Sequence, residues 1–94
     1  MAGPTFEWDD AKAKSNLVKH GVSFVAAMRV FGDPLRIERV DTRRGYGEER
    51  IQVIGQVGGE VLFVVYTERG TGYRMISARK ATRNEREEYQ ARQS

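Results

Sequence analysis

The sequence predicts an α+β fold with a short N-terminal strand, two N-terminal helices, an antiparallel β-meander and a C-terminal helix. Three observations lead to this prediction. Apolar residues recur with helical spacing over residues 24–31, whereas from residue 35 onward the pattern becomes that of strands. Short glycine-containing segments separate the last three apolar runs, as expected for strands joined by hairpins. A helix-start signal then follows residue 81.

The N-terminal elements are defined mainly by their ends. Thr5–Trp8 alternates polar and apolar residues and is predicted to form a short strand. A first helix is predicted over residues 9–20, because acidic residues suit its first turn and basic residues suit its last. Gly21 favours a left-handed end. Ser23 is a good N-cap for a second helix, which Gly32-Asp33-Pro34 should end.

Four β segments are predicted in the second half of the chain. They are Leu35–Asp41, Arg50–Val57, Val61–Glu68 and Tyr73–Lys80. The third segment is apolar on both faces, so we expect it at the centre of the sheet. Thr82 and Glu85 form a capping box for the final helix. That helix has few apolar anchors besides Tyr89, and we expect it to pack loosely or to be displaced by a partner.

Composition narrows the class of protein. The 94 residues, 39% hydrophobic and 31% charged, suit one soluble domain spanning residues 1–94. No apolar run approaches the roughly 20 residues of a membrane span and no secretory signal is present, so we expect a cytoplasmic protein without membrane contact. Cysteine is absent and His20 is the single histidine. We therefore expect no disulfide, no metal and no cofactor, although a magnesium site made only of carboxylates is compatible with the sequence.

The net charge of +3 is unevenly distributed, because basic residues outnumber acidic ones over residues 69–94. A local excess of cations favours phosphate-bearing partners, since each bound cation releases counterions from a polyanion. Arg69 and Arg74 flank a predicted tight hairpin together with Glu68. The two arginines can grip a phosphate, or one can form a cross-strand ion pair with the glutamate. Both interpretations remain open on the sequence alone.

The end of the last predicted strand is also basic. Arg79 and Lys80 stand just before the N-terminus of the final helix, where the helix dipole favours an anion. Strand alternation places Arg74 and Arg79 on opposite faces if the strand is regular. One site can use both arginines only if a bulge intervenes. Tyr66, in the preceding strand, offers a ring on which a base can stack.

Two residues are candidates for proton transfer. His20 can act as a general acid or base near neutral pH, or it can bond free carbonyl groups at the end of a helix. Glu49 precedes Arg50 at the start of a strand, after a segment rich in turn residues. Its carboxylate can accept a proton from a ribose 2′-hydroxyl, or it can be a solvated surface group. The residues alone do not decide between these roles.

Three blocks of residues follow one another in an order that is specific as a set. They are Phe6-Glu7-Trp8-Asp9 with Asn16 and Lys19–Phe24; Val30–Pro34; and Gly47–Arg50 through Thr67–Gly70, Arg74–Thr82 and Glu85. In this order they resemble the successive signatures of the BrnT family of toxins, over nearly the whole chain. Gly32 stands where a polar or acidic residue is common in that family. We interpret this difference as harmless helix termination.

The resemblance implies a toxin related in fold to RelE-type ribonucleases, which cuts RNA without a metal and so inhibits translation and growth. Cleavage in this broader group proceeds by attack of the 2′-hydroxyl on the adjacent phosphate. The resemblance also implies a DNA-binding antitoxin of the BrnA type, two copies of each protein in the complex, and contact with operator DNA only through the antitoxin. The residues predicted for catalysis are His20, Glu49, Arg69, Arg74 and Arg79. Those predicted for RNA binding are Lys19, Arg50, Tyr66 and Lys80.

Two other functions are compatible with parts of the sequence. A catalytically inactive module that binds the antitoxin and acts in transcriptional autoregulation would need the same fold, but the presence of Glu49 and the three predicted arginines favours a nuclease. Direct DNA binding is disfavoured, because no helix has a concentrated basic face. In the helix after Thr82, acidic residues balance the basic ones.

Overall fold

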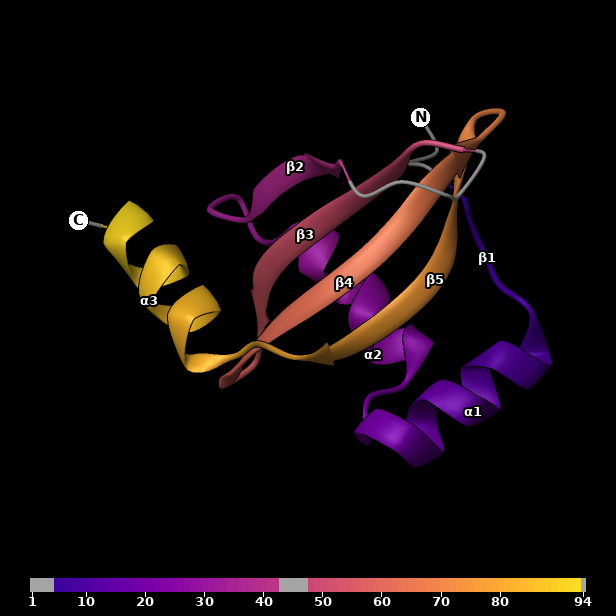
Figure 1. Ribbon diagram of the computed structural model, residues 1–94, viewed down its shortest axis with the longest axis horizontal. Helices are drawn as coiled ribbons and strands as arrows, with labels where there is room; N and C mark the ends of the chain where they lie inside the picture. Colours follow the sequence, from indigo (N-terminus) through magenta and orange to yellow (C-terminus); the bar gives the residue numbers. More distant parts are fainter. Residues whose placement is uncertain (1–4, 43–47, 94) are drawn as a thin grey trace.

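A computed structural model describes residues 5–42 and 48–93 and contains a five-stranded mixed sheet in the order β1-β5-β4-β3-β2 (Figure 1). The elements are β1 (Phe6–Glu7), α1 (Asp10–His20), α2 (Phe24–Ala27), the 3₁₀ helix η1 (Met28–Gly32), β2 (Ile37–Asp41), β3 (Arg50–Val57), β4 (Glu60–Arg69), β5 (Gly72–Lys80) and α3 (Arg83–Arg92). β1 is parallel to β5, and all other pairs are antiparallel. The predicted α+β class and the meander are confirmed. No helix in the described ranges is long and apolar enough to cross a membrane.

The first helix has the predicted ends, whereas the second is shorter than expected. The side chain of Asp9 accepts hydrogen bonds from the first turn of α1, and Gly21 ends the helix with φ of 71°. Glycine adopts that left-handed conformation without strain. Ser23 caps α2 as predicted, but the α-helix ends after Ala27 and continues as η1. Such tighter turns are common at helix C-termini, and this one stops before Asp33.

α1, α2 and η1 cover one face of the sheet (Figure 1). The buried core on this side combines residues of the helices and strands: Val22, Phe24, Ala27, Val30, Val53, Leu62, Val64, Tyr66, Met75 and Ala78. β4 lies in the middle of the sheet and is buried on both faces, as its apolar sequence predicts. The other face of β4 contributes Phe63 and Val65 to a second, smaller cluster below α3.

A buried amide fixes α1 against the outer edge of β5. Asn16 Nδ2 donates to the backbone oxygens of Val22, at 2.9 Å, and Ala78, at 2.8 Å. Its Oδ1 accepts from the N–H of Ala78 at 3.1 Å. β1 pairs with β5 only at Tyr73 and Arg74. Further along β5, the Asn16 side chain therefore makes the hydrogen bonds that a neighbouring strand would otherwise supply.

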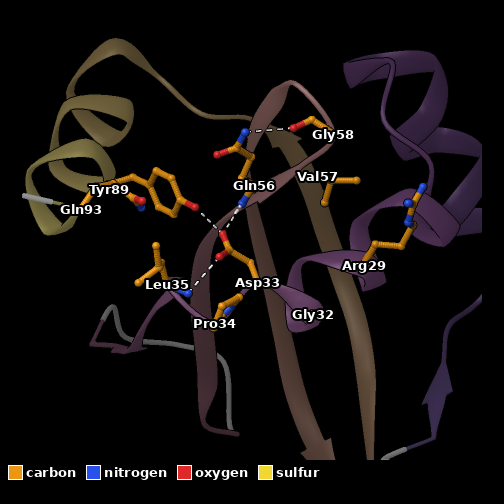
Figure 2. Close-up of a pocket in the computed structure, with 10 residues that line it drawn as sticks. All are labelled: Arg29, Gly32, Asp33, Pro34, Leu35, Gln56, Val57, Gly58, Tyr89 and Gln93. Atoms are coloured by element: carbon orange, nitrogen blue, oxygen red, sulfur yellow. Dashed lines mark hydrogen bonds between the residues drawn. The ribbon is translucent and has the colours of Figure 1, made fainter.

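α3 lies on the opposite face and is attached more firmly than its sequence suggests. The predicted capping box is present, and Tyr89 is buried. The Tyr89 hydroxyl donates to the carboxylate of Asp33, as Figure 2 shows. The same carboxylate accepts from the backbone N–H groups of Leu35, at 2.9 Å, and Gln56, at 2.8 Å. One buried aspartate thus ties α3 to β3 and to the turn before β2.

Asp33 should make the stability of the fold sensitive to acid. Burial raises the pKa of this carboxyl group, but hydrogen bonds from Tyr89 and two backbone N–H groups, with the charge of Arg36, lower the pKa below its ordinary 3.8. A lowered folded-state pKa contributes stability above the unfolded-state pKa, and this contribution is lost as pH falls through the folded-state pKa. We therefore expect the melting temperature to be steady at neutral pH and to fall below about pH 4.

Thermal denaturation followed by circular dichroism between neutral pH and about pH 3 tests this expectation. An Asp33→Asn variant should melt at a lower temperature at neutral pH, because the charge-assisted hydrogen bonds are weakened. It should also lose less stability on acidification than the wild type does. Equal acid losses in the two proteins would show that Asp33 is not the group responsible.

Candidate functional site

β5 contains one extra residue relative to β4. The pairing of the two strands shifts between Val65 and Tyr66, so that Val65 lies opposite Ser77 and Tyr66 lies opposite Met75. Ile76 has no partner of its own in this register and forms a β-bulge. Such a bulge reverses the alternation of side chains beyond it. The two halves of β5 therefore do not follow one continuous alternation.

The bulge brings two of the predicted site arginines to the same face of the sheet. Arg74 lies opposite Thr67, and Arg79 lies opposite Phe63. These two β4 residues are four positions apart and therefore point to the same side. That side is opposite to the one covered by α1 and α2. The condition under which one site can use both arginines is met, because β5 is irregular at Ile76.

A depression of about 370 Å³ lies on this face, between the strands and the first turn of α3. Its lining residues come from β2, β3, β4, β5 and α3: Arg39, Gln52, Phe63, Val65, Ser77, Arg79 and Glu85. We call these seven residues the arginine depression. Arg39, Gln52, Val65 and Ser77 form one row across four strands by their pairing register. The two β4 residues thus form an apolar floor, and the other five residues form polar walls.

Arg79 is held in a defined orientation in the arginine depression. Its guanidinium group donates to both carboxylate oxygens of Glu85, at 2.8 and 3.0 Å, and to the backbone oxygen of Lys80 at 3.2 Å. Its Cζ atom is 4.1 Å from the centroid of the Phe63 ring, a cation–π contact. A guanidinium has five N–H groups. Three of them are used here, which leaves two for a ligand.

The carboxylates of α3 face the arginines of the depression. Burial raises the pKa of Glu85, but hydrogen bonds and charge from Arg79, with bonds to Thr82, lower the pKa below its ordinary 4.5. Glu85 is therefore ionised at neutral pH and can orient Arg79. Glu88 pairs with Arg39 at 2.6 Å. Both of these side chains are more than 40% exposed, so this second pair contributes little to stability.

Arg74 lies at the other end of the same face, close to the start of β3. Thr67 Oγ1 donates to the backbone oxygen of Glu49 at 2.7 Å, which anchors the start of β3 beside the β4 partner of Arg74. Within residues 5–42 and 48–93, Arg74 has no hydrogen bond or ion pair. By strand alternation, Arg50 and Arg69 also point to this face. Four of the predicted residues are therefore distributed along one side of the sheet: Arg50, Arg69, Arg74 and Arg79.

Two residues predicted to bind RNA lie on the other face. Tyr66 is only 3% exposed, and its hydroxyl donates to Glu38 at 2.8 Å. Burial and this hydrogen bond raise the pKa of Tyr66, and the buried ring has no room to stack on a base. Lys80 is opposite Leu62, a residue of the helix-side core, and pairs with Glu60 at 3.6 Å. Tyr66 and Lys80 are therefore placed away from the arginine depression, and the RNA-binding roles predicted for them stay predictions.

The remaining predicted residues, Lys19 and His20, lie at the end of α1 and outside the arginine depression. They line a second depression of about 190 Å³ at the outer edge of β5. Ser77 lines both depressions. The histidine is therefore separated from Glu49, the other predicted proton-transfer residue, which stands at the start of β3.

A wider depression of about 670 Å³ lies beside Asp33 and Tyr89. Figure 2 shows that the carboxylate at its centre is already bound by the Tyr89 hydroxyl and two backbone N–H groups, while Arg29 points away from it. These polar groups are engaged in holding α3. We therefore take the sheet face that carries Arg74 and the arginine depression as the candidate site.

Three contributors to the site were missed by sequence reasoning. Gln52 lies between Ile51 and Val53 in β3, and this alternation could have indicated a polar position on the far face. Arg39 belongs to β2, whose sequence has no such alternation. Glu85 was interpreted only as part of a helix cap. Its second role, orienting Arg79, depends on the path of the chain between β5 and α3 and has no local signal in the sequence.

A sheet covered by helices on one face, with arginines around a depression on the other, defines a small α+β protein suited to a phosphate-bearing polymer. Residues 8–85, which include the whole arginine depression, match the family described as the ribonuclease toxin, BrnT, of type II toxin–antitoxin systems. The chain belongs to this BrnT family. Membership implies ribonuclease toxin activity and an antitoxin partner. No curated protein matches the chain.

Proposed function

We propose that the arginine-bearing sheet face is the active site and that it cuts RNA without a metal ion. The observation that supports this best is the bulge at Ile76, which puts Arg74 and Arg79 on one face. Guanidinium groups fit the oxygens of a phosphate and keep their charge at any physiological pH. They can therefore stabilise the negative charge that develops on the phosphate in the transition state.

The proposed reaction is an internal transfer of the phosphate. The ribose 2′-oxygen forms a bond to the adjacent phosphorus, and the bond from phosphorus to the 5′-oxygen breaks. Glu49 accepts the proton of the 2′-hydroxyl, and water supplies the proton that the departing 5′-oxygen gains. The products are a 2′,3′-cyclic phosphate and a 5′-hydroxyl end. The proposal assigns His20 no part in this step, because it lines the depression at the outer edge of β5.

The two arginines are assigned different phosphates. Their partners in β4 are four residues apart, which corresponds to about 13 Å along a strand. Arg74 lies opposite Thr67, whose hydroxyl binds the backbone of Glu49, and it is assigned to the phosphate that is cut. Arg79, fixed by Glu85, is assigned to a neighbouring phosphate.

The cellular role is part of the same proposal and is supported by membership of the family. The toxin would act in the cytoplasm, where cleavage of RNA stops translation and growth, and a BrnA-type antitoxin would neutralise it. We propose a complex with two copies of each protein, in which only the antitoxin contacts operator DNA. An inactive module that binds the antitoxin for autoregulation is the alternative, and it predicts no cleavage at all.

Incubation of the purified protein with total RNA in excess chelator tests the proposal. We expect cleavage to persist, and the fragments to have 5′-hydroxyl ends that a kinase labels without prior phosphatase treatment. Glu49→Gln should reduce cleavage roughly 100-fold, within the range for loss of a general base. The matched control is Glu48→Gln, which removes the neighbouring exposed carboxylate and should retain activity.

Other results of these cleavage assays would contradict different parts of the proposal. Cleavage that requires added Mg²⁺, or fragments with 5′-phosphate ends, would contradict the metal-free transfer. Equal activity of the Glu49→Gln and Glu48→Gln proteins would remove Glu49 from the mechanism. Absence of cleavage by the wild type, with a bound antitoxin still detectable, would favour the inactive module.

A further inference from the structure

We propose that the RNA continues from the arginine depression over the outer edge of β5 onto a basic stripe of α1. The stripe consists of Lys12, Ser15, Asn16, Lys19 and His20, and the ligand it accepts is a single-stranded RNA segment next to the one that is cut. This inference rests on the proposed function, because it assumes that RNA occupies the arginine depression. It gives the stripe a role in substrate binding rather than in proton transfer.

The stripe is one continuous face of α1. Positions 12, 15, 16, 19 and 20 follow the spacing of neighbouring residues on one side of a helix. At its centre, Asn16 binds the backbone of Ala78 and Val22 and so holds this face against the edge of β5. Together with Ile76 and Ser77, the stripe lines the depression of about 190 Å³. Its position beside the sheet is therefore fixed by buried hydrogen bonds.

The two depressions meet at one residue. Ser77 contributes to the wall of the arginine depression on the sheet face and to the depression under the α1 stripe. β1 pairs with β5 only at Tyr73 and Arg74, so no strand pairs with the outer edge of β5 at Ser77 within the described part of the chain. A flexible strand that lies over Arg79 can cross the edge at this point.

The charges of the stripe favour a polyanion. Lys12 and Lys19 are both exposed, and seven residues of helix separate them by about 10.5 Å along the axis. No acidic residue is among those that line this depression, and neither lysine has an ion pair with another described residue. Two separated cations without carboxylate partners suit successive phosphates better than a single small anion.

Helix stability alone does not explain the position of Lys12. It is the third residue of α1, close to the positive end of the helix dipole, where a cation is unfavourable. The position of Lys19, in the last turn of α1, is favourable for the helix dipole as well as for RNA binding. Lys12 is therefore the more informative of the two lysines, since its presence costs the isolated helix some stability.

The depression and its surroundings favour a single strand over a duplex. A volume of about 190 Å³ accepts part of a nucleotide, whereas a rigid RNA duplex cannot bend over the edge of a sheet. The partly exposed ring of His20 can stack on an unpaired base, as aromatic side chains do in proteins that recognise single-stranded RNA.

Binding of an RNA that cannot be cut tests this inference directly. The probe is a fluorescent 12-nucleotide RNA with 2′-O-methyl riboses, which lack the attacking hydroxyl. Lys12→Gln and Lys19→Gln should each raise Kd roughly three- to tenfold and reduce the slope of log Kd against log salt by about 0.7. Lys14→Gln is the matched control, because Lys14 is exposed on the same helix but lines an apolar depression with Trp8 and Leu17. Its Kd should not change.

Cleavage assays separate this inference from the proposal on which it rests. With an unmodified RNA, Lys12→Gln and Lys19→Gln should raise KM more than they lower kcat, and the loss should be larger for 12 nucleotides than for a dinucleotide. If both variants behave as Lys14→Gln does while the wild type cuts RNA, the proposed RNA-binding role of the stripe is wrong. The proposed active site is then unaffected. If the wild type neither binds nor cuts RNA, both proposals fail. Loss of antitoxin binding with unchanged RNA binding would assign the stripe to the protein partner and overturn the inference.

Discussion

Replacing Asn16 by leucine should lower the free energy of unfolding by about 3–5 kcal/mol. The asparagine makes three hydrogen bonds that join α1 to β5 and to the segment after α1. Leucine has a similar size but would leave the N–H and oxygen of Ala78 and the oxygen of Val22 buried without partners. Each such group costs about 1–3 kcal/mol. For a domain of this size, we expect the melting temperature to fall by more than about 12 °C.

Urea and thermal denaturation followed by circular dichroism measure this loss. Ser15→Ala is the control, because Ser15 is exposed and next to Asn16 in the same helix. Its effect should stay within about 0.5 kcal/mol. Asn16→Asp should be at least as damaging as leucine, since a buried carboxylate would face two carbonyl oxygens. A loss below about 1 kcal/mol for Asn16→Leu would mean that water or a shift of α1 replaces the bonds.

The features of the fold that depend on a few neighbouring residues, such as helix ends, could be predicted from the sequence. Gly21 ends α1 with a left-handed residue, and Thr82 begins α3 with a capping box, as expected from the residues at those positions. The central place of β4 followed from a run that is apolar on both faces. Each of these features depends on a few neighbouring residues, so each leaves a local signal.

Features that depend on distant pairing could not be predicted. Asn16 bonds to Ala78, 62 residues further along the chain, and nothing around either residue indicates the other. The bulge at Ile76 is a property of the register between β4 and β5. The sequence of β5 alone is equally compatible with a regular strand. The 3₁₀ continuation after Ala27 likewise depends on how η1 meets the sheet.

The same distinction applies to the candidate site. Arginine and glutamate could be chosen by their chemistry, so Arg74, Arg79 and Glu49 were predicted as residues. The common face of Arg74 and Arg79 could be predicted only on the condition that β5 contains a bulge. Tyr66 and Lys80 were placed at the site from residue type, whereas strand register puts them on the helix side of the sheet.

Replacing Arg74 by alanine should reduce kcat/KM for RNA cleavage by roughly 1,000-fold, the upper range for loss of one group that stabilises transition-state charge. The melting temperature should change by less than about 3 °C. Arg74 is partly exposed, and its side chain makes no hydrogen bond or ion pair with another residue in the described ranges. Its removal therefore leaves no buried partner unsatisfied, and the two measurements should separate clearly.

Arg83→Ala is the matched control for the loss of one positive charge. Arg83 lies on α3, is 85% exposed in its side chain, and has a single distant ion pair, 3.8 Å from Glu87. It should retain nearly full activity, because it belongs to the first turn of α3, outside the arginine depression and outside the strand that carries Arg74. If Arg74→Ala and Arg83→Ala lose activity equally, the effect of Arg74 is only general attraction of RNA by net charge. A large loss at Arg74 alone, with an unchanged melting temperature, would require the guanidinium to act on the bound phosphate itself, which depends on the face that the bulge at Ile76 gives it.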